Sequence, residues 1–67
     1  MTVQSDLKKA LAAAESAKGT YATFSQATDD NSAQNMFEQM ASDMDRHISQ
    51  INSRLGVTAQ NALNQQE

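Results

Sequence analysis

The stretch Thr28-Asp29-Asp30-Asn31-Ser32 decides the fold of this 67-residue chain, because it separates two long segments that both have helical patterns. All five side chains are short and carry an oxygen atom, so they compete for backbone hydrogen bonds and favour turns and helix starts. Within the stretch, Asp30 is the predicted N-cap of the second segment. The chain has no proline and only two glycines, which favours long helices on both sides of the turn.

The segment before the turn has the pattern of one amphipathic helix over about residues 3–28. Apolar or small residues recur there in alternating steps of four and three, the spacing of one helix face. They are Val3, Leu7, Ala10, Ala14, Ala17, Tyr21, Phe24 and Thr28, and Leu11 widens the stripe. Thr2 precedes the helix as its predicted N-cap, and Asp6 lies near the positive end of the helix dipole.

The segment after the turn predicts a second amphipathic helix over about residues 31–55. Its stripe consists of Ala33, Phe37, Met40, Met44, Ile48, Ile51 and Leu55, with Met36, Ala41 and His47 along the edges. Gly56 is the predicted helix end, because glycine adopts the left-handed conformation without a Cβ clash.

Residues 57–67 are rich in glutamine and asparagine and carry few apolar side chains, so we expect this tail to be disordered. An alternative remains open for this segment. If the helix continues through Gly56, then Leu55, Ala59, Ala62 and Leu63 fall near one apolar face. This face could reach across a dimer and pack on the start of the first helix near Val3 and Leu7.

Two helices joined by a short turn predict an all-α antiparallel hairpin over residues 1–56. Its core is thin, because 11 of the 26 hydrophobic residues are alanine, and the absence of cysteine rules out a disulfide. We therefore expect two hairpins to form a homodimeric four-helix bundle. The predicted core and interface residues are Val3, Leu7, Leu11, Ala14, Ala17, Tyr21, Phe24, Phe37, Met40, Met44, Ile48, Ile51 and Leu55.

Charge and hydropathy disfavour several classes of function. The net charge is −3 and the five basic residues are scattered, so no basic surface for nucleic acid is expected. The apolar run after Lys8-Lys9 ends at Glu15, which is short for a signal peptide, and no stretch reaches the length of a membrane span. We expect a soluble cytoplasmic protein that does not insert into membranes.

The sequence offers no catalytic set, so we expect no enzymatic activity and no cofactor. It has seven serines but one histidine and no cysteine, and its two glycines are isolated. Asp43 and His47 are four residues apart, a spacing at which a helix could chelate a metal ion. A solvated structural pair is the favoured interpretation, and Met44 stands where a di-iron Glu-x-x-His motif would need glutamate.

Met36, Met40 and Met44 form an adaptable strip on the second helix. Core filling is the favoured interpretation, because the stripe continues through Ile48 and Ile51. The alternative is a small regulatory protein that sequesters a partner helix through this methionine-rich face.

The chain also resembles a known family over roughly residues 1–55. The resemblance lies in Met1-Thr2-Val3, the Leu7/Leu11 spacing, the segment from Ala17 to Phe24, Thr28-Asp29-Asp30, and Ala33-x-x-Met36-Phe37. These features are similar to the short bacterial proteins of domain of unknown function family 1657, found in endospore formers. Family members end in an acidic tail with proline and tyrosine, unlike residues 58–67 here.

The resemblance implies an association with spores and no catalytic residues. Together with the helical pattern, it predicts a non-enzymatic structural or protein-interaction module of the cytoplasm, forespore or spore. Its expected partner is a second copy of itself, with another spore protein as the alternative.

Overall fold

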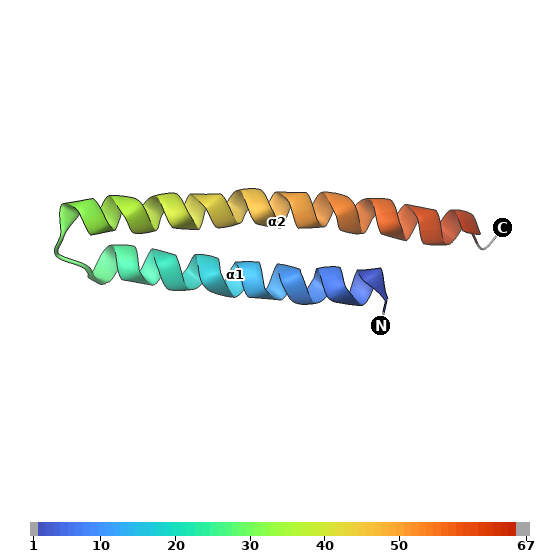
Figure 1. The fold of residues 1–67 in the computed structure, drawn as a ribbon, viewed down its shortest axis with the longest axis horizontal. Coiled ribbons are helices and arrows are strands. Elements are labelled where there is room, and N and C mark those ends of the chain that lie inside the picture. Colours follow the sequence, from blue (N-terminus) through green and yellow to red (C-terminus); the bar gives the residue numbers. More distant parts are fainter. Residues whose placement is uncertain (1, 66–67) are drawn as a thin grey trace.

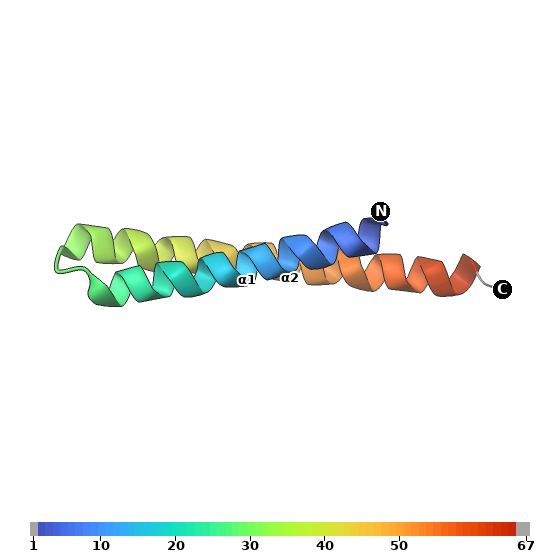
Figure 2. The same ribbon diagram turned by 90° about the horizontal axis from the view of Figure 1, so that it is seen from below.

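The computed structural model describes residues 2–65, with side chains through residue 59, and it consists of two antiparallel α-helices (Figure 1). Helix α1 spans Val3–Ala27 and helix α2 spans Asn31–Gln65. The two helices lie side by side along the whole of α1 and cross at a shallow angle (Figure 2). The predicted all-α hairpin is confirmed.

Both predicted N-caps are present. The Thr2 hydroxyl oxygen accepts a hydrogen bond from the Ser5 backbone N–H at 3.1 Å, and the Asp30 carboxylate accepts one from the Ala33 N–H at 2.8 Å. Between the helices, Thr28 is extended, with φ −80° and ψ 143°. Its hydroxyl accepts a hydrogen bond from the Asp30 N–H at 3.3 Å. The short polar side chains therefore form the turn in the way that their chemistry predicts.

The predicted helix end at Gly56 is wrong. Helix α2 continues through this residue to Gln65, and no glycine of the described chain has a positive φ. The glycine costs about 1 kcal/mol in a helix, but without a proline nothing removes a backbone donor there. Beyond it, Thr58 and Ala59 are half-buried, and the Thr58 hydroxyl donates to the Leu55 carbonyl at 3.1 Å.

The predicted disorder of the tail is also wrong for residues 57–65, which are helical. The alternative expectation, a helix continuing past Gly56, is the one that the backbone adopts. The side chains of Ala62 and Leu63 and the final residues 66 and 67 lie outside the described part, so the predicted apolar face is described only as far as Ala59.

The hairpin is elongated. Its extents are 57 × 18 × 11 Å and its radius of gyration is 15.9 Å, whereas a compact domain of this length has a radius of gyration of about 11 Å. Helix α2 extends past the start of α1, which leaves an open end opposite the turn (Figure 1). The molecule therefore has two distinct ends and two long flanks.

Little is buried in this hairpin. Of the residues whose side chains are described, only Ala14 and Ser25 are buried, at 8% and 4% exposure, and no large side chain is fully buried. One helix can cover only one strip of its partner, so the apolar stripe of each helix extends beyond the contact.

Candidate interaction surface

The contact between the helices follows a seven-residue repeat, which we call the seam. Its positions recur in steps of three and four, as in an antiparallel coiled coil. In α1 they are Leu7, Leu11, Ala14, Lys18, Tyr21, Ser25 and Thr28, and in α2 they are Gln34, Phe37, Ala41, Met44, Ile48, Ile51, Leu55 and Thr58. Most of these residues are half-buried or buried, and Lys18 is exposed.

The register of the seam is fixed by three contacts between the helices. Lys18 Nζ lies 2.6 Å from a carboxylate oxygen of Asp45. The Ser25 hydroxyl oxygen lies 3.4 Å from a carboxylate oxygen of Glu38. The Phe24 and Phe37 rings, near the turn, have centroids 5.4 Å apart. By this register, Leu7 lies opposite Leu55 and Ala14 lies opposite Ile48.

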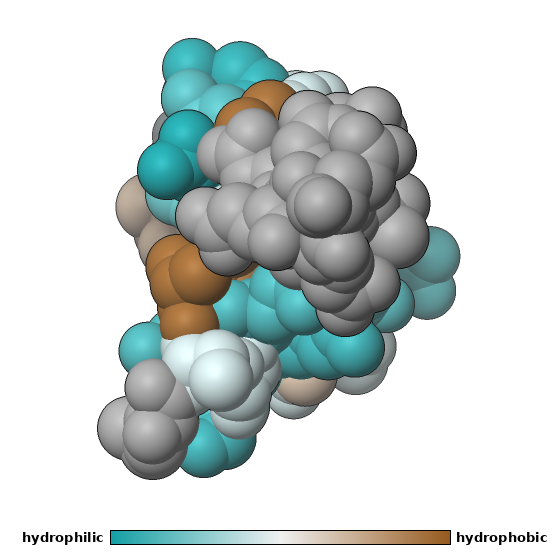
Figure 3. All heavy atoms as spheres, turned by 90° about the vertical axis from the view of Figure 1, so that its right-hand side faces the viewer, coloured by the Kyte–Doolittle hydropathy of each residue, from teal (hydrophilic) through white to brown (hydrophobic). Residues whose placement is uncertain are grey.

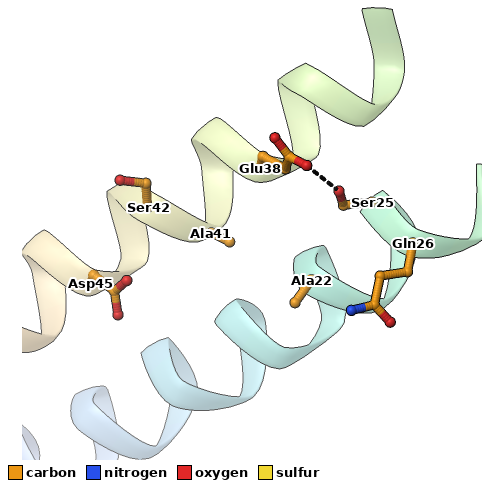
Figure 4. Close-up of a pocket in the computed structure, with 7 residues that line it drawn as sticks. All are labelled: Ala22, Ser25, Gln26, Glu38, Ala41, Ser42 and Asp45. Carbon is orange, nitrogen blue, oxygen red and sulfur yellow. Dashed lines mark hydrogen bonds between the residues drawn. The ribbon is translucent and has the colours of Figure 1, made fainter. Parts of the chain in front are cut away.

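One side of the seam is polar, and we call it the serine flank. Its residues are Glu15, Gly19, Ala22 and Gln26 of α1 and Glu38, Ser42 and Asp45 of α2, which line shallow hollows beside the seam. Figure 4 shows Ala22 and Ala41 close to the seam and the Ser25 hydroxyl directed at Glu38. This hydroxyl also lies 3.4 Å from the Gln34 carbonyl, so its proton has two acceptors. Glu38 and Asp45 of this flank therefore both contact α1, through Ser25 and Lys18.

The opposite side is more apolar, and we call it the methionine flank. Its residues are Val3, Ala10, Ala17 and Phe24 of α1 and Met36, Met40, Asp43, His47, Arg54 and Val57 of α2. Met40, Asp43 and His47 line a shallow hollow with Tyr21 and Met44 of the seam. Ala10, Ala17 and Phe24 each precede a seam residue, so they lie on the side away from Glu15 and Ala22.

The predicted core and interface residues divide between the seam and the methionine flank. Leu7, Leu11, Ala14, Tyr21, Phe37, Met44, Ile48, Ile51 and Leu55 lie in the seam, whereas Val3, Ala17, Phe24 and Met40 lie on the flank. Among the flank residues, Val3 is 56% exposed and Phe24 is 48% exposed. The sequence stripe is thus wider than the strip that one partner helix covers.

Sequence reasoning missed two polar contributions to the seam, Ser25 and the Lys18–Asp45 pair. A signal was available for both, because Leu11, Lys18 and Ser25 are seven residues apart and alternate with Leu7, Ala14 and Tyr21. The preference for apolar residues drew the predicted stripe through Ala10, Ala17 and Phe24 instead.

The Asp43 carboxylate is engaged by neighbours on its own helix. It accepts hydrogen bonds from Arg46 at 2.7 Å and from Gln39 at 3.2 Å. These two hydrogen bonds, the Arg46 bond first, lower the pKa of Asp43 below its ordinary value of 3.8. A metal ion chelated by Asp43 and His47 would have to compete with Arg46, and the described residues contain no group of three or more potential metal ligands.

Two threonine hydroxyls of α1 bond within their own helix. Thr20 donates to the Ser16 carbonyl at 3.0 Å and Thr23 to the Gly19 carbonyl at 2.9 Å, so both bond to the preceding turn of the helix. Within residues 2–65, neither helix combines the length and apolar composition that crossing a membrane requires. The methionine flank holds the exposed large hydrophobic residues Val3, Phe24, Met36 and Val57, which makes it the candidate interaction surface.

Comparison with known proteins identifies a family. Residues 7–55 match the profile of the family described as Protein of unknown function (DUF1657), which agrees with the resemblance found in the sequence. The match includes the turn and the seam from Leu7 to Leu55. No curated protein and no solved structure matches the chain. Because the profile covers most of the sequence, the chain belongs to the DUF1657 family.

Proposed function

We propose that this DUF1657 protein is a non-enzymatic structural or protein-interaction module that acts as a homodimer of helical hairpins, packed as a four-helix bundle. In this proposal the molecule works by presenting and packing helix surfaces. The hairpin itself supplies half of the bundle, and a second copy supplies the other half.

The observation that carries the proposal is the exposed surface of the single hairpin. The chain exposes 4919 Å², whereas a compact protein of 7.3 kDa exposes about 4,200 Å². The excess of roughly 700 Å² is close to the ~800 Å² that each partner buries in a standard protein interface. Association with a second copy would bring the exposed area into the ordinary range.

Sedimentation equilibrium at micromolar concentration tests the dimer directly. We expect a mass twice the monomer mass of 7.3 kDa, with a helical circular dichroism spectrum at the same concentration. A fully helical species that stays at the monomer mass over the whole concentration range would refute the dimer. An unfolded chain at low concentration that becomes helical as it dimerises would support it strongly, because folding and association would then be linked.

A second candidate function is supported by the exposure of Met36, which is 52% exposed while Met40 and Met44 are half-buried. In this alternative the protein is a small regulator that exchanges its dimer contact for one helix of a target and thereby holds the target inactive. Affinity capture from sporulating cells distinguishes the two candidates. A stoichiometric partner lost on Met36→Lys substitution would favour the regulator, whereas recovery of the protein alone favours the structural module.

We further propose that the protein acts in the cytoplasm of sporulating cells or in the spore, on the basis of the family resemblance. Immunoblots through growth and sporulation test this location. Detection confined to the forespore or mature spore is the expected result. Abundant protein in growing cells would contradict the spore association and leave the dimer proposal untouched.

A further inference from the structure

The most exposed large hydrophobic side chains of the described residues all lie on the methionine flank. Val3, Phe24, Met36 and Val57 are 56%, 48%, 52% and 46% exposed. Val3 and Phe24 are 21 residues apart, as are Met36 and Val57, so each pair repeats one position after three seven-residue repeats. Seen from the open end, hydrophobic surface is exposed beside the start of α1 and again at the upper edge of the molecule (Figure 3).

The serine flank differs in composition. Its residues are polar, charged or small, and it carries no large hydrophobic side chain among the residues described. Its charged groups include Asp45, which is already paired with Lys18 across the seam. A partner that buried this flank would desolvate these groups without apolar contacts in return, which disfavours it as an interface.

We infer that a second copy of the chain docks on the methionine flank, with the two turns at opposite ends of the bundle. The inference rests on the proposed homodimer and adds the face and the orientation. In this arrangement each α1 lies antiparallel to the partner's α1, and each α2 lies antiparallel to the partner's α2.

The charge distribution favours an arrangement with the two turns at opposite ends of the bundle over one with both turns at the same end. Residues 22–40, next to the turn, contain three acidic residues and no basic one, namely Asp29, Asp30 and Glu38. At the open end, residues 2–11 and 50–59 contain Lys8, Lys9 and Arg54 against Asp6 alone. Packed helices are about 8–10 Å apart, comparable to the Debye length of about 8 Å, so the charge of a neighbouring end is felt. The acidic turn end of one copy therefore attracts the basic open end of the other, whereas two turn ends side by side would repel each other.

Side-chain volume leads to the same orientation. On the α1 part of the methionine flank, Phe24 lies near the turn, whereas Val3 and Ala10 lie toward the open end. Turns at the same end would bring Phe24 of one copy toward the bulky Met36 of the other. With turns at opposite ends, each α1 packs on the partner's α1, so Phe24 lies toward smaller residues, which keeps this layer even.

A matched pair of substitutions tests the face. Ala10 and Ala22 are both exposed in the interior of α1, Ala10 on the methionine flank and Ala22 on the serine flank. We expect Ala10→Arg to raise the dimer dissociation constant by at least about tenfold and Ala22→Arg to change it by less than about threefold. Sedimentation measures both, and circular dichroism checks that both variants are helical.

Each pattern of results has a definite meaning. Loss of the dimer in Ala22→Arg with retention in Ala10→Arg would overturn the inferred face while leaving the homodimer in place. A wild-type protein that is monomeric throughout would instead overturn the proposed function itself. Equal loss in both variants would also overturn the inference, because the interface would then not be confined to one flank.

Spin labels test the orientation, because the chain contains no cysteine that would compete with an introduced one. A label at Asn31→Cys lies at the turn, and a label at Ser16→Cys lies near the middle of α1. For turns at opposite ends, the Asn31 labels should be about 40 Å apart, since a helix of 25 residues is about 37 Å long. The Ser16 labels should give a shorter distance.

The alternative orientation gives a different measurement. Turns at the same end would bring the Asn31 labels within about 25 Å, because neighbouring helix axes are only about 8–10 Å apart. That result would overturn the orientation while the dimer stands. Absence of any dipolar signal at both positions would show that no dimer forms and would overturn the proposed function.

Discussion

Replacement of Gly56 by alanine tests the continuation of α2 through a residue that the sequence predicts to end it. In the helix, alanine is about 0.8–1.0 kcal/mol more favourable than glycine. A Cβ atom built at Gly56 meets nothing within 4 Å, so the substitution adds no clash. We expect Gly56→Ala to stabilise the protein by about 0.5–1 kcal/mol, the lower value reflecting fraying near the helix end.

The expected change is measurable by thermal unfolding. For a domain of this size, 1 kcal/mol shifts the midpoint by about 4–8 °C, so Gly56→Ala should raise Tm by about 2–8 °C. Circular dichroism at 222 nm follows the transition, and all variants are compared at one protein concentration because a dimer's Tm depends on concentration.

Gly19→Ala is the matched control, because Gly19 lies inside α1 and its added Cβ also meets nothing within 4 Å. Gly19 lies on the serine flank, away from the inferred interface, so we expect a rise in Tm there too. A left-handed helix end at Gly56 would instead make alanine cost about 1–2 kcal/mol. A fall in Tm for Gly56→Ala together with a rise for Gly19→Ala would therefore refute the continuous helix.

Four further predictions concern the seam, the tail and Asp43. Met44→Asp should abolish helical folding and association together, because it places a charge in the seam; a folded variant of unchanged mass would show that Met44 is outside it. Ser25→Ala should change the free energy of unfolding by less than about 0.5 kcal/mol in urea titrations, since the lost contacts are long and alanine favours the helix; a loss above about 1.5 kcal/mol would contradict this. Deleting residues 58–67 should lower the free energy of unfolding by about 1–2 kcal/mol, more than the ~0.5 kcal/mol of an ordinary surface change, because Thr58 and Ala59 are half-buried. Deleting residues 60–67 retains both residues and should lower it by less. Equal losses would contradict the packing of Thr58 and Ala59. Arg46→Gln should raise the pKa of Asp43 toward 3.8 in an NMR titration, and an unchanged pKa would contradict the pairing. Because the pKa of Asp43 is lowered in the folded protein, the wild-type pair should stabilise the fold above about pH 3.8 and lose that contribution as the pH falls through the folded pKa.

The fold was predictable from sequence where local chemistry dominates. Thr2, Asp30 and the polar stretch around them place helix starts and the turn, because short side-chain oxygens bond to nearby backbone N–H groups whatever the rest of the chain does. The helix end at Gly56 was not predictable in the same way. A glycine permits an end without requiring one, and here Thr58 and Ala59 are half-buried beyond it.

The interaction surface, like the fold, was predictable from sequence only in part. The apolar stripe of α1 includes Leu7, Ala14 and Tyr21, which are half-buried or buried, and it treats Phe24 as equivalent to them although Phe24 is 48% exposed. Only the register of the two helices, given by the Lys18–Asp45 and Ser25–Glu38 contacts, separates the seam from the flank. Periodicity within one helix cannot contain that information, because it depends on how the partner helix is rotated and shifted.

The separation of seam from flank changes how the exposed apolar residues are understood. A stripe fully used within the hairpin would offer nothing to a partner, whereas exposed stripe residues such as Val3 and Phe24 are available to a second surface. Val3, Phe24, Met36 and Val57 occupy repeat positions on one side, while polar, charged or small residues line the other side. Scattered exposed residues would be ordinary for a small protein. Their gathering on one flank, in two pairs that are each 21 residues apart, fits packing against another helix layer, so the face of the proposed dimer can be tested separately from its existence.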